Sequence, residues 1–189
     1  MGVLMNIETL HDLFLYELRG AYYVETELAD ALEGIRDRVA VDTLDEVADE
    51  ELHETVAEAF ASHREETERQ VERLERAFDA IDRQPETREM PSLDALVDET
   101  ERFNNVVLND AIRPLFYLDA GTKIERLELR MYDSLLRLAR ALDAPEDAID
   151  ALETNRREEE AALTNLRELS DGSEADSVLD ELAERSSGF

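Results

Sequence analysis

Phe60 to Phe78 reads FASHREETERQVERLERAF, with apolar residues three and four places apart and no glycine or proline. Such spacing is typical of a helix that turns one face toward a core. The pattern extends back to Val56 and predicts a helix from about Glu50 to Asp82, with Asp49 as its N-cap. His63 lies among the apolar residues of this face, so the helix would carry an imidazole into the core.

Three other long stretches have the same helical pattern. One runs from about Ile7 to Val39 with Asn6 as its N-cap, another from about Asp110 to Leu142, and the last from about Glu146 to Leu169. Pro114 is compatible with the second of these only if that helix begins near it, because proline lacks the N–H that a helix interior needs. The sequence therefore predicts four long helices.

The connections between these helices differ in length. Val41–Ala48 predicts a short connector, whereas Arg83–Ser92 holds two prolines and is the clearest break. A short helix is expected over Leu93–Arg102, and we find no strand-like period of any length. We predict an all-α fold, namely a ferritin-like (rubrerythrin-like) antiparallel four-helix bundle with one crossover connection.

The predicted domain organisation is a bundle over residues 1–169 followed by an acidic C-terminal tail over 170–189. The tail contains a patterned piece, Val178–Leu182, between segments rich in serine and glycine. Both a short docked helix and a disordered tail are compatible with this composition.

The charge of the chain is strongly one-sided. Its 49 Asp and Glu residues outnumber its 20 Lys and Arg residues, for a formal net charge of −29, and Lys123 is the only lysine. Because high salt screens such repulsion, this composition predicts a halophilic protein from a salt-rich cytoplasm. A surface that attracts cations toward a metal site is the compatible alternative. Nucleic acid is an unfavourable partner, because its phosphates would be repelled.

Several classes of protein are excluded or disfavoured. Without cysteine the chain has no disulfide, thiolate metal site or cysteine nucleophile. No apolar run reaches the length of a membrane span, and the first fifteen residues lack a basic signal-peptide region. We therefore expect a cytoplasmic protein without membrane contact. No Gly-rich phosphate loop or nucleophile–base motif indicates nucleotide binding or hydrolysis.

Each long helix places one possible metal ligand on its apolar face. These residues are Glu25, His63, Glu125 and Glu159. Burying an unpaired carboxylate costs several kcal/mol, so convergence on a cation is the economical explanation. Carboxylate oxygens with an imidazole nitrogen suit iron or manganese, and zinc less selectively.

Two further acids extend this set at helical spacing. Glu66 follows His63 by three residues and Glu128 follows Glu125 by three, so each lies on the flank of its apolar face. Six ligands are enough for two metal ions bridged by carboxylates. Solvated glutamates and a satisfied core histidine are the simpler reading of any one of these positions. The order His-x-x-Glu is also the reverse of the usual Glu-x-x-His motif of such bundles.

The sequence resembles the YciE/YciF-type stress-protein family from about Thr9 to Leu169. The resemblance is carried by Leu10–Phe14, Tyr22–Glu25, Phe60–Thr67, Gln70–Phe78, Ile124–Tyr132 and the pair Glu158–Glu159. It implies a ferritin-like homodimer associated with stress responses and often with a two-metal centre. Glu25, His63, Glu125, Glu128 and Glu159 match the positions implied by the family's motifs. Arg126 departs from the pattern, because many relatives have histidine there, and this implies a weaker or different site.

Three functions are compatible with these observations. The first is a di-iron or di-manganese protein with ferroxidase or peroxide-related activity. The second is a non-enzymatic metal-binding or structural stress protein. The third is a helical bundle without metal, whose inner acids are protonated or paired with Arg126, Arg130 or Arg156.

Overall fold

The computed structural model describes residues 6–40 and 50–186, and this part of the chain is helical without any strand. The elements are α1 (Leu10–Val39), α2 (Glu50–Ala80), α3 (Pro91–Val106), a 3-10 turn η1 (Asp110–Ile112), α4 (Arg113–Ala141), α5 (Glu146–Ser170) and α6 (Ser173–Arg185). The prediction of an all-α fold is confirmed. None of the described helices is long and apolar enough to cross a membrane.

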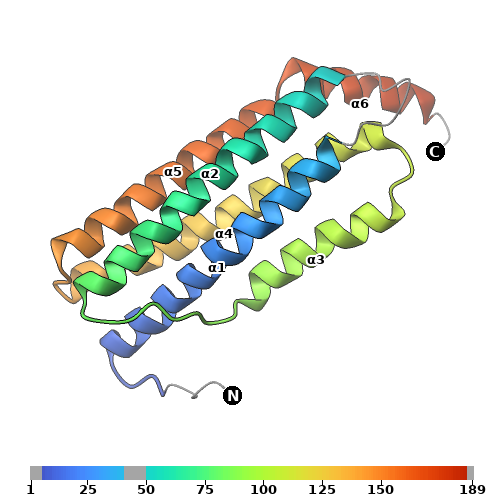
Figure 1. Cartoon of the computed structure of the whole chain (residues 1–189). Coiled ribbons are helices and arrows are strands. Elements are labelled where there is room, and N and C mark those ends of the chain that lie inside the picture. Colours follow the sequence, from blue (N-terminus) through green and yellow to red (C-terminus); the bar gives the residue numbers. More distant parts are fainter. Residues whose placement is uncertain (1–5, 41–49, 187–189) are drawn as a thin grey trace.

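Four long helices form the body of the molecule (Figure 1). Helix α1 packs against α2 and α4, and α5 packs against the same two helices. Along the chain, α1 and α2 run in opposite directions, as do α4 and α5 (Figure 1). Helix α3 connects α2 to α4 in the sequence. It lies along the outside of the body and contacts α1 and α4 (Figure 1). It is therefore the crossover that returns the chain to the other end of the body.

The start of α1 differs from the prediction. Thr9 rather than Asn6 is the N-cap, and its hydroxyl accepts a hydrogen bond from the Asp12 backbone N–H at 3.1 Å. The Asp12 carboxylate accepts one in return from the Thr9 N–H at 2.9 Å. This reciprocal capping box satisfies two backbone donors that a cap at Asn6 would leave to water. The predicted connector 41–48 and the cap at Asp49 lie outside the described residues.

The crossover helix is longer than expected, because α3 continues past Arg102 to Val106. Pro91 opens it, where a missing N–H costs nothing. The Phe103 ring stacks on Phe116 of α4 with the centroids 3.6 Å apart. This packing favours the extra helical turn at the C-terminal end of α3.

Helix α4 begins three residues later than predicted. Asp110–Ile112 forms the 3-10 turn η1 instead, and the Asn109 side chain accepts a hydrogen bond from the Ala111 N–H at 3.2 Å. The α-helix then opens at Arg113, with Pro114 in its first turn as the sequence requires.

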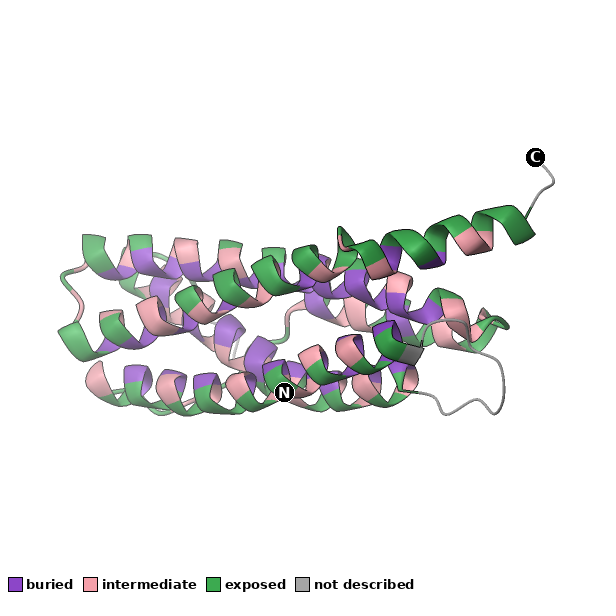
Figure 2. Cartoon of the chain, turned by 90° about the horizontal axis from the view of Figure 1, so that it is seen from above, coloured by how far each residue is buried: buried purple, intermediate pink, exposed green. Residues whose placement is uncertain are grey.

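The core lies along the inner faces of the long helices (Figure 2). Gly121 allows a close approach there: a Cβ at this position would lie 2.9 Å from Leu166 Cδ1 and 3.1 Å from the Phe60 ring. Beyond α5, α6 contacts α2 and α5 and buries Ala175 and Val178. Residues 173–185 of the predicted tail are therefore a docked helix.

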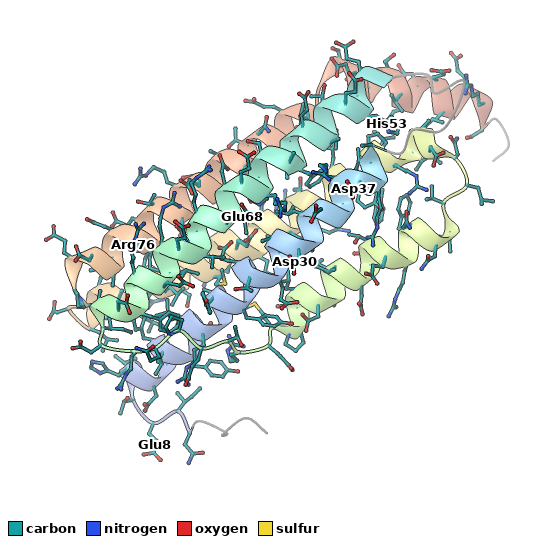
Figure 3. The ribbon with its side chains drawn as sticks, viewed as in Figure 1. Glu8, Asp30, Asp37, His53, Glu68 and Arg76 are labelled. Atoms are coloured by element: carbon teal, nitrogen blue, oxygen red, sulfur yellow. The ribbon has the colours of Figure 1, made fainter. Side chains whose placement is uncertain are left out.

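Acidic and basic side chains cover the outer faces of the helices. Asp30, Glu68 and Arg76 are exposed examples on α1 and α2 (Figure 3). His53 is different, because it is buried and its Nδ1 lies 2.8 Å from the Val39 carbonyl oxygen. That contact joins the beginning of α2 to the end of α1 and is structural.

Candidate metal centre

Four ionisable side chains meet in the interior. His63 comes from α2, Glu125 and Glu128 from α4, and Glu159 from α5. One potential ligand atom from each lies within 4.8 Å of the others, and each residue is no more than 6% exposed. Glu125 and Glu128 reach one point because residues three apart share a helix face. We call these four residues the cluster.

The imidazole of His63 forms the α2 side of the cluster and lies near the carboxylates of α4 and α5. Its Nε2 lies 3.0 Å from Glu125 Oε1 and 4.0 Å from Glu159 Oε2. Its Nδ1 points toward the other side, 4.0 Å from Glu66 Oε2. One ring therefore stands between two buried carboxylates and a third that is 33% exposed.

Glu25 of α1 is fully buried and interacts electrostatically with His63 and Glu125 of the cluster. The Tyr132 hydroxyl donates a hydrogen bond to Glu25 Oε1. The Asn155 amide donates to that hydroxyl at 2.9 Å and to the Gln70 carbonyl oxygen at 3.2 Å. One oxygen of Glu25 is thus held by α4, while the other has no hydrogen-bond partner among the described residues.

The polarity of this hydrogen-bond chain is fixed from its outer end. The Arg73 guanidinium, which can only donate, lies 2.9 Å from Asn155 Oδ1. The amide oxygen of Asn155 therefore faces Arg73 and its NH₂ group faces Tyr132. With its oxygen accepting from that amide, Tyr132 directs its own proton to Glu25. Arg73 is itself held by Glu158 through contacts of 2.6 and 2.7 Å.

The inner carboxylates have unused capacity to bind a cation. Glu25 Oε2, Glu125 Oε2 and both side-chain oxygens of Glu128 and Glu159 are buried without a hydrogen-bond partner in the described part of the chain. Buried polar atoms are nearly always satisfied, and an unsatisfied carboxylate is among the most expensive exceptions. A donor set of carboxylate oxygens and one imidazole fits iron or manganese. The residues therefore fit a metal site.

Without a cation the burial of these groups opposes their ionisation. Burial raises the pKa of Glu25 to about 7, despite the Tyr132 hydrogen bond that lowers it. Burial first, and then the neighbouring carboxylates, raise the pKa of Glu128 and Glu159 well above the usual range. Burial alone would lower the pKa of His63, but Glu125, Glu66 and Glu159 together raise it well above its ordinary value. Bound cations would reverse the preference of the carboxylates.

The structure places the six predicted ligands at different depths. Four of them form the cluster and Glu25 interacts electrostatically with it, whereas Glu66 is half-buried on the far side of His63. Glu128, expected on the flank of its helix, is fully buried. The alternative in which arginines pair with the inner acids is wrong for the three arginines considered. Arg126 and Arg130 are exposed, and Arg156 pairs with Asp133 and Glu160.

Sequence reasoning missed two functional elements beside the cluster. Asn155 was not considered, although it lies on the apolar face of α5 one turn before Glu159 and is fully buried. Its position on that face was the available signal. Glu158, which the sequence does not place on an apolar face, is half-buried and pairs with Arg73. Tyr132 is packed in the core and donates a hydrogen bond to Glu25, which no pattern in the sequence indicates.

The fold and this cluster define a class of all-helical protein with a buried carboxylate–imidazole group that could bind a metal. The chain belongs to the DUF892 family, a domain of unknown function, which matches residues 9–179. The chain is 25% identical to Protein YciF of Escherichia coli (strain K12) over 139 residues, which are 73% of this chain and 76% of that protein. The resemblance to YciF-type proteins is confirmed at this level.

Two solved structures have the same overall fold. YcfI from Rhodopseudomonas palustris, for which a structural role has been suggested, matches with a TM-score of 0.75 and 26% identity. The match covers 88% of this chain and 98% of YcfI. The E. coli stress protein YciF matches with a TM-score of 0.75 and 23% identity, over 87% of this chain and 96% of that one. At that identity the second likeness concerns the fold alone.

Proposed function

We propose that the protein is a ferritin-like, stress-associated protein that binds a carboxylate-bridged dinuclear centre of iron or manganese. The observation that carries the proposal is the set of buried carboxylate oxygens near His63 that have no hydrogen-bond partner among residues 6–40 and 50–186. Five buried side chains from four helices would form the centre: Glu25, His63, Glu125, Glu128 and Glu159. Ferritin-like bundles also hold two metal ions with inward-projecting carboxylates and imidazoles from four helices, although His63 lacks the glutamate three residues before it that their usual motif contains.

Each ligand has a distinct part in the proposed centre. In the described part of the chain, Glu128 and Glu159 each have both side-chain oxygens without a hydrogen-bond partner, so each could offer two oxygens to the metal ions. Glu25 offers Oε2 alone, because its Oε1 accepts a hydrogen bond from the Tyr132 hydroxyl. His63 offers one ring nitrogen. When bound, iron or manganese would supply redox chemistry toward oxygen or peroxide.

The residues around this centre would orient one of its ligands, Glu25. The chain from Arg73 through Asn155 to Tyr132 orients a proton donor toward Glu25. Hydrogen bonds of this kind orient first-shell ligands and tune the metal they hold. A homodimer, a cytoplasmic location, adaptation to salt and the absence of nucleic-acid partners also belong to the proposal, on the grounds of family resemblance and charge.

Oxygen uptake after Fe(II) addition tests the proposed activity. Tag-free wild-type protein should consume oxygen faster than the buffer does, and Glu128→Ala should reduce the rate to that of the buffer. Glu68→Ala, an exposed glutamate on α2, is the matched control and should behave as the wild type (Figure 3). Metal bound without any oxygen uptake would instead support a non-enzymatic metal protein. Neither binding nor uptake would leave a purely structural role.

A further inference from the structure

A cavity of about 210 Å³ opens between α2 and α5 beside the cluster. Much of its lining consists of small side chains, namely Ala59 and Ser62 on α2 and Ala161 and Ala162 on α5. Ser62 and Ala161 are exposed to solvent. The cavity therefore reaches the surface, where small side chains of both helices form part of its lining.

The inner end of this cavity is formed by the cluster itself. His63 and Glu125 line the cavity and also belong to the cluster. They are 6% and 1% exposed, yet His63 Nδ1 and Glu125 Oε2 have no hydrogen-bond partner among the described residues. A polar atom left unsatisfied beside a cavity is a position that a ligand or water can occupy.

Glu66 stands between the two ends. It lines the cavity, its side chain is 33% exposed, and its Oε2 lies 4.0 Å from His63 Nδ1. One carboxylate therefore has contact with solvent while its oxygen lies close to a buried ring of the cluster.

Charge distinguishes this cavity from a larger groove on the same molecule. That groove has a volume of about 660 Å³ and is lined by Arg137, Arg140, Arg156 and Arg157, beside fewer acids. A cation would be disfavoured near four guanidinium groups. The smaller cavity has two carboxylates and no basic side chain other than His63.

We propose that the α2–α5 cavity is the route by which a divalent cation reaches the cluster, with Glu66 as the first carboxylate to bind it. This inference rests on the metal centre proposed above. At about 30 Å³ per water, a shell of about six waters fills about 180 Å³, which is comparable to the cavity. Glu66 thus offers an oxygen where the cation still keeps most of its water, and Glu125 offers the next at the inner end.

The rate of Co²⁺ uptake tests this route separately from the centre. Co²⁺ is mixed with tag-free apoprotein in a stopped-flow spectrometer, and the ions bound per chain are measured after gel filtration. Ala59→Leu and Ala162→Leu should slow uptake about tenfold, the effect of an added barrier of about 1.4 kcal/mol, without changing the ions bound. Glu66→Gln, which preserves size, should also slow uptake at unchanged final stoichiometry.

Ala141→Leu is the matched control, because Ala141 is exposed at the end of α4 and far along the chain from the cavity lining. It should load at the wild-type rate. If the wild type binds Co²⁺ and the cavity variants and Glu66→Gln all load at its rate, the route is wrong while the centre stands. If the wild type binds no Co²⁺, the centre itself fails and the route with it.

Discussion

The Tyr132 hydroxyl donates a hydrogen bond to the buried Glu25 carboxylate, and so joins α4 to α1 across the interior. The direction of this hydrogen bond is set two residues away, by the Arg73 contact to Asn155. Among the described residues, the bond leaves Glu25 one buried oxygen, Oε2, without a hydrogen-bond partner.

Tyr132→Phe should destabilise the protein by about 1–3 kcal/mol, because Glu25 Oε1 and the Asn155 amide both lose a partner in the core. Thermal unfolding of the metal-free protein measures the effect. Tyr22→Phe is the control, since its hydroxyl bonds Glu75 at 2.9 Å near the surface and its loss should cost much less. Equal losses of stability in the two variants would show that the buried hydrogen bond contributes no more than the one near the surface.

Asn155→Asp should be more damaging than its size suggests. A carboxylate at 155 cannot donate to the Tyr132 hydroxyl or to the Gln70 carbonyl, and it adds a charge beside buried acids. We expect a loss of about 3 kcal/mol or more, and a loss that shrinks as the pH falls and the new carboxyl is protonated. Chemical denaturation at pH 5 and pH 8 measures both. A cost that is small and independent of pH would contradict the polarity assigned to the chain.

Two glycines in helices should respond to alanine with opposite signs. Gly34→Ala should stabilise the protein by up to about 1 kcal/mol, because alanine is the better helix former and its Cβ would meet nothing closer than 4.0 Å. Gly121→Ala should destabilise it by about 1 kcal/mol or more, since the same gain is outweighed by contacts with Leu166 and the Phe60 ring. Unfolding curves of both variants check the prediction. Stabilisation by Gly121→Ala would mean that the core relaxes around the new methyl group.

The metal-free protein should lose stability as the pH rises. Burial raises the pKa of Glu25 from its ordinary value of 4.5 to about 7 in the folded protein, so its contribution to stability is complete below about pH 4.5 and lost as the pH rises through 7. The raised pKa values of Glu128 and Glu159 act in the same direction at higher pH. The Glu25 part alone amounts to about 3 kcal/mol. Unfolding free energies between pH 4.5 and 8.5 should therefore decline.

Glu128→Gln should flatten this decline and raise the stability at pH 8, because the amide cannot ionise. Glu68→Gln makes the same change of net charge at an exposed position and should leave the slope unchanged. Identical slopes for the two variants would place the pH dependence on the acidic surface rather than on the buried carboxylates.

The helices and most of the inner residues could be predicted from the sequence because helical periodicity fixes which residues share a face. Glu25, His63, Glu125 and Glu159 needed no more than that. The depth of the two flanking acids could not be predicted in the same way. Glu66 and Glu128 both follow a candidate ligand by three residues, yet Glu66 is half-buried and Glu128 is fully buried. The difference comes from how α2, α4 and α5 pack, which a one-dimensional pattern does not contain.

Local chemistry also decided details that periodicity left open. Asn6 and Thr9 are both residues that cap helices, and the partner Asp12 selects Thr9. The hydrogen-bond chain from Arg73 to Glu25 joins residues up to 107 positions apart, and so no short motif reveals it. Residue spacing located the candidate ligands but did not show what orients them.

Metal content per chain, measured on protein purified without an affinity tag, is the sharpest test of the proposed centre. We expect about two iron or manganese ions per wild-type chain and a sharp loss in both Glu25→Ala and Glu125→Ala. Glu27→Ala, an exposed glutamate of α1, should retain the wild-type content. Undiminished metal in both inner variants, or none in the wild type after loading with Fe(II) or Mn(II), would contradict it.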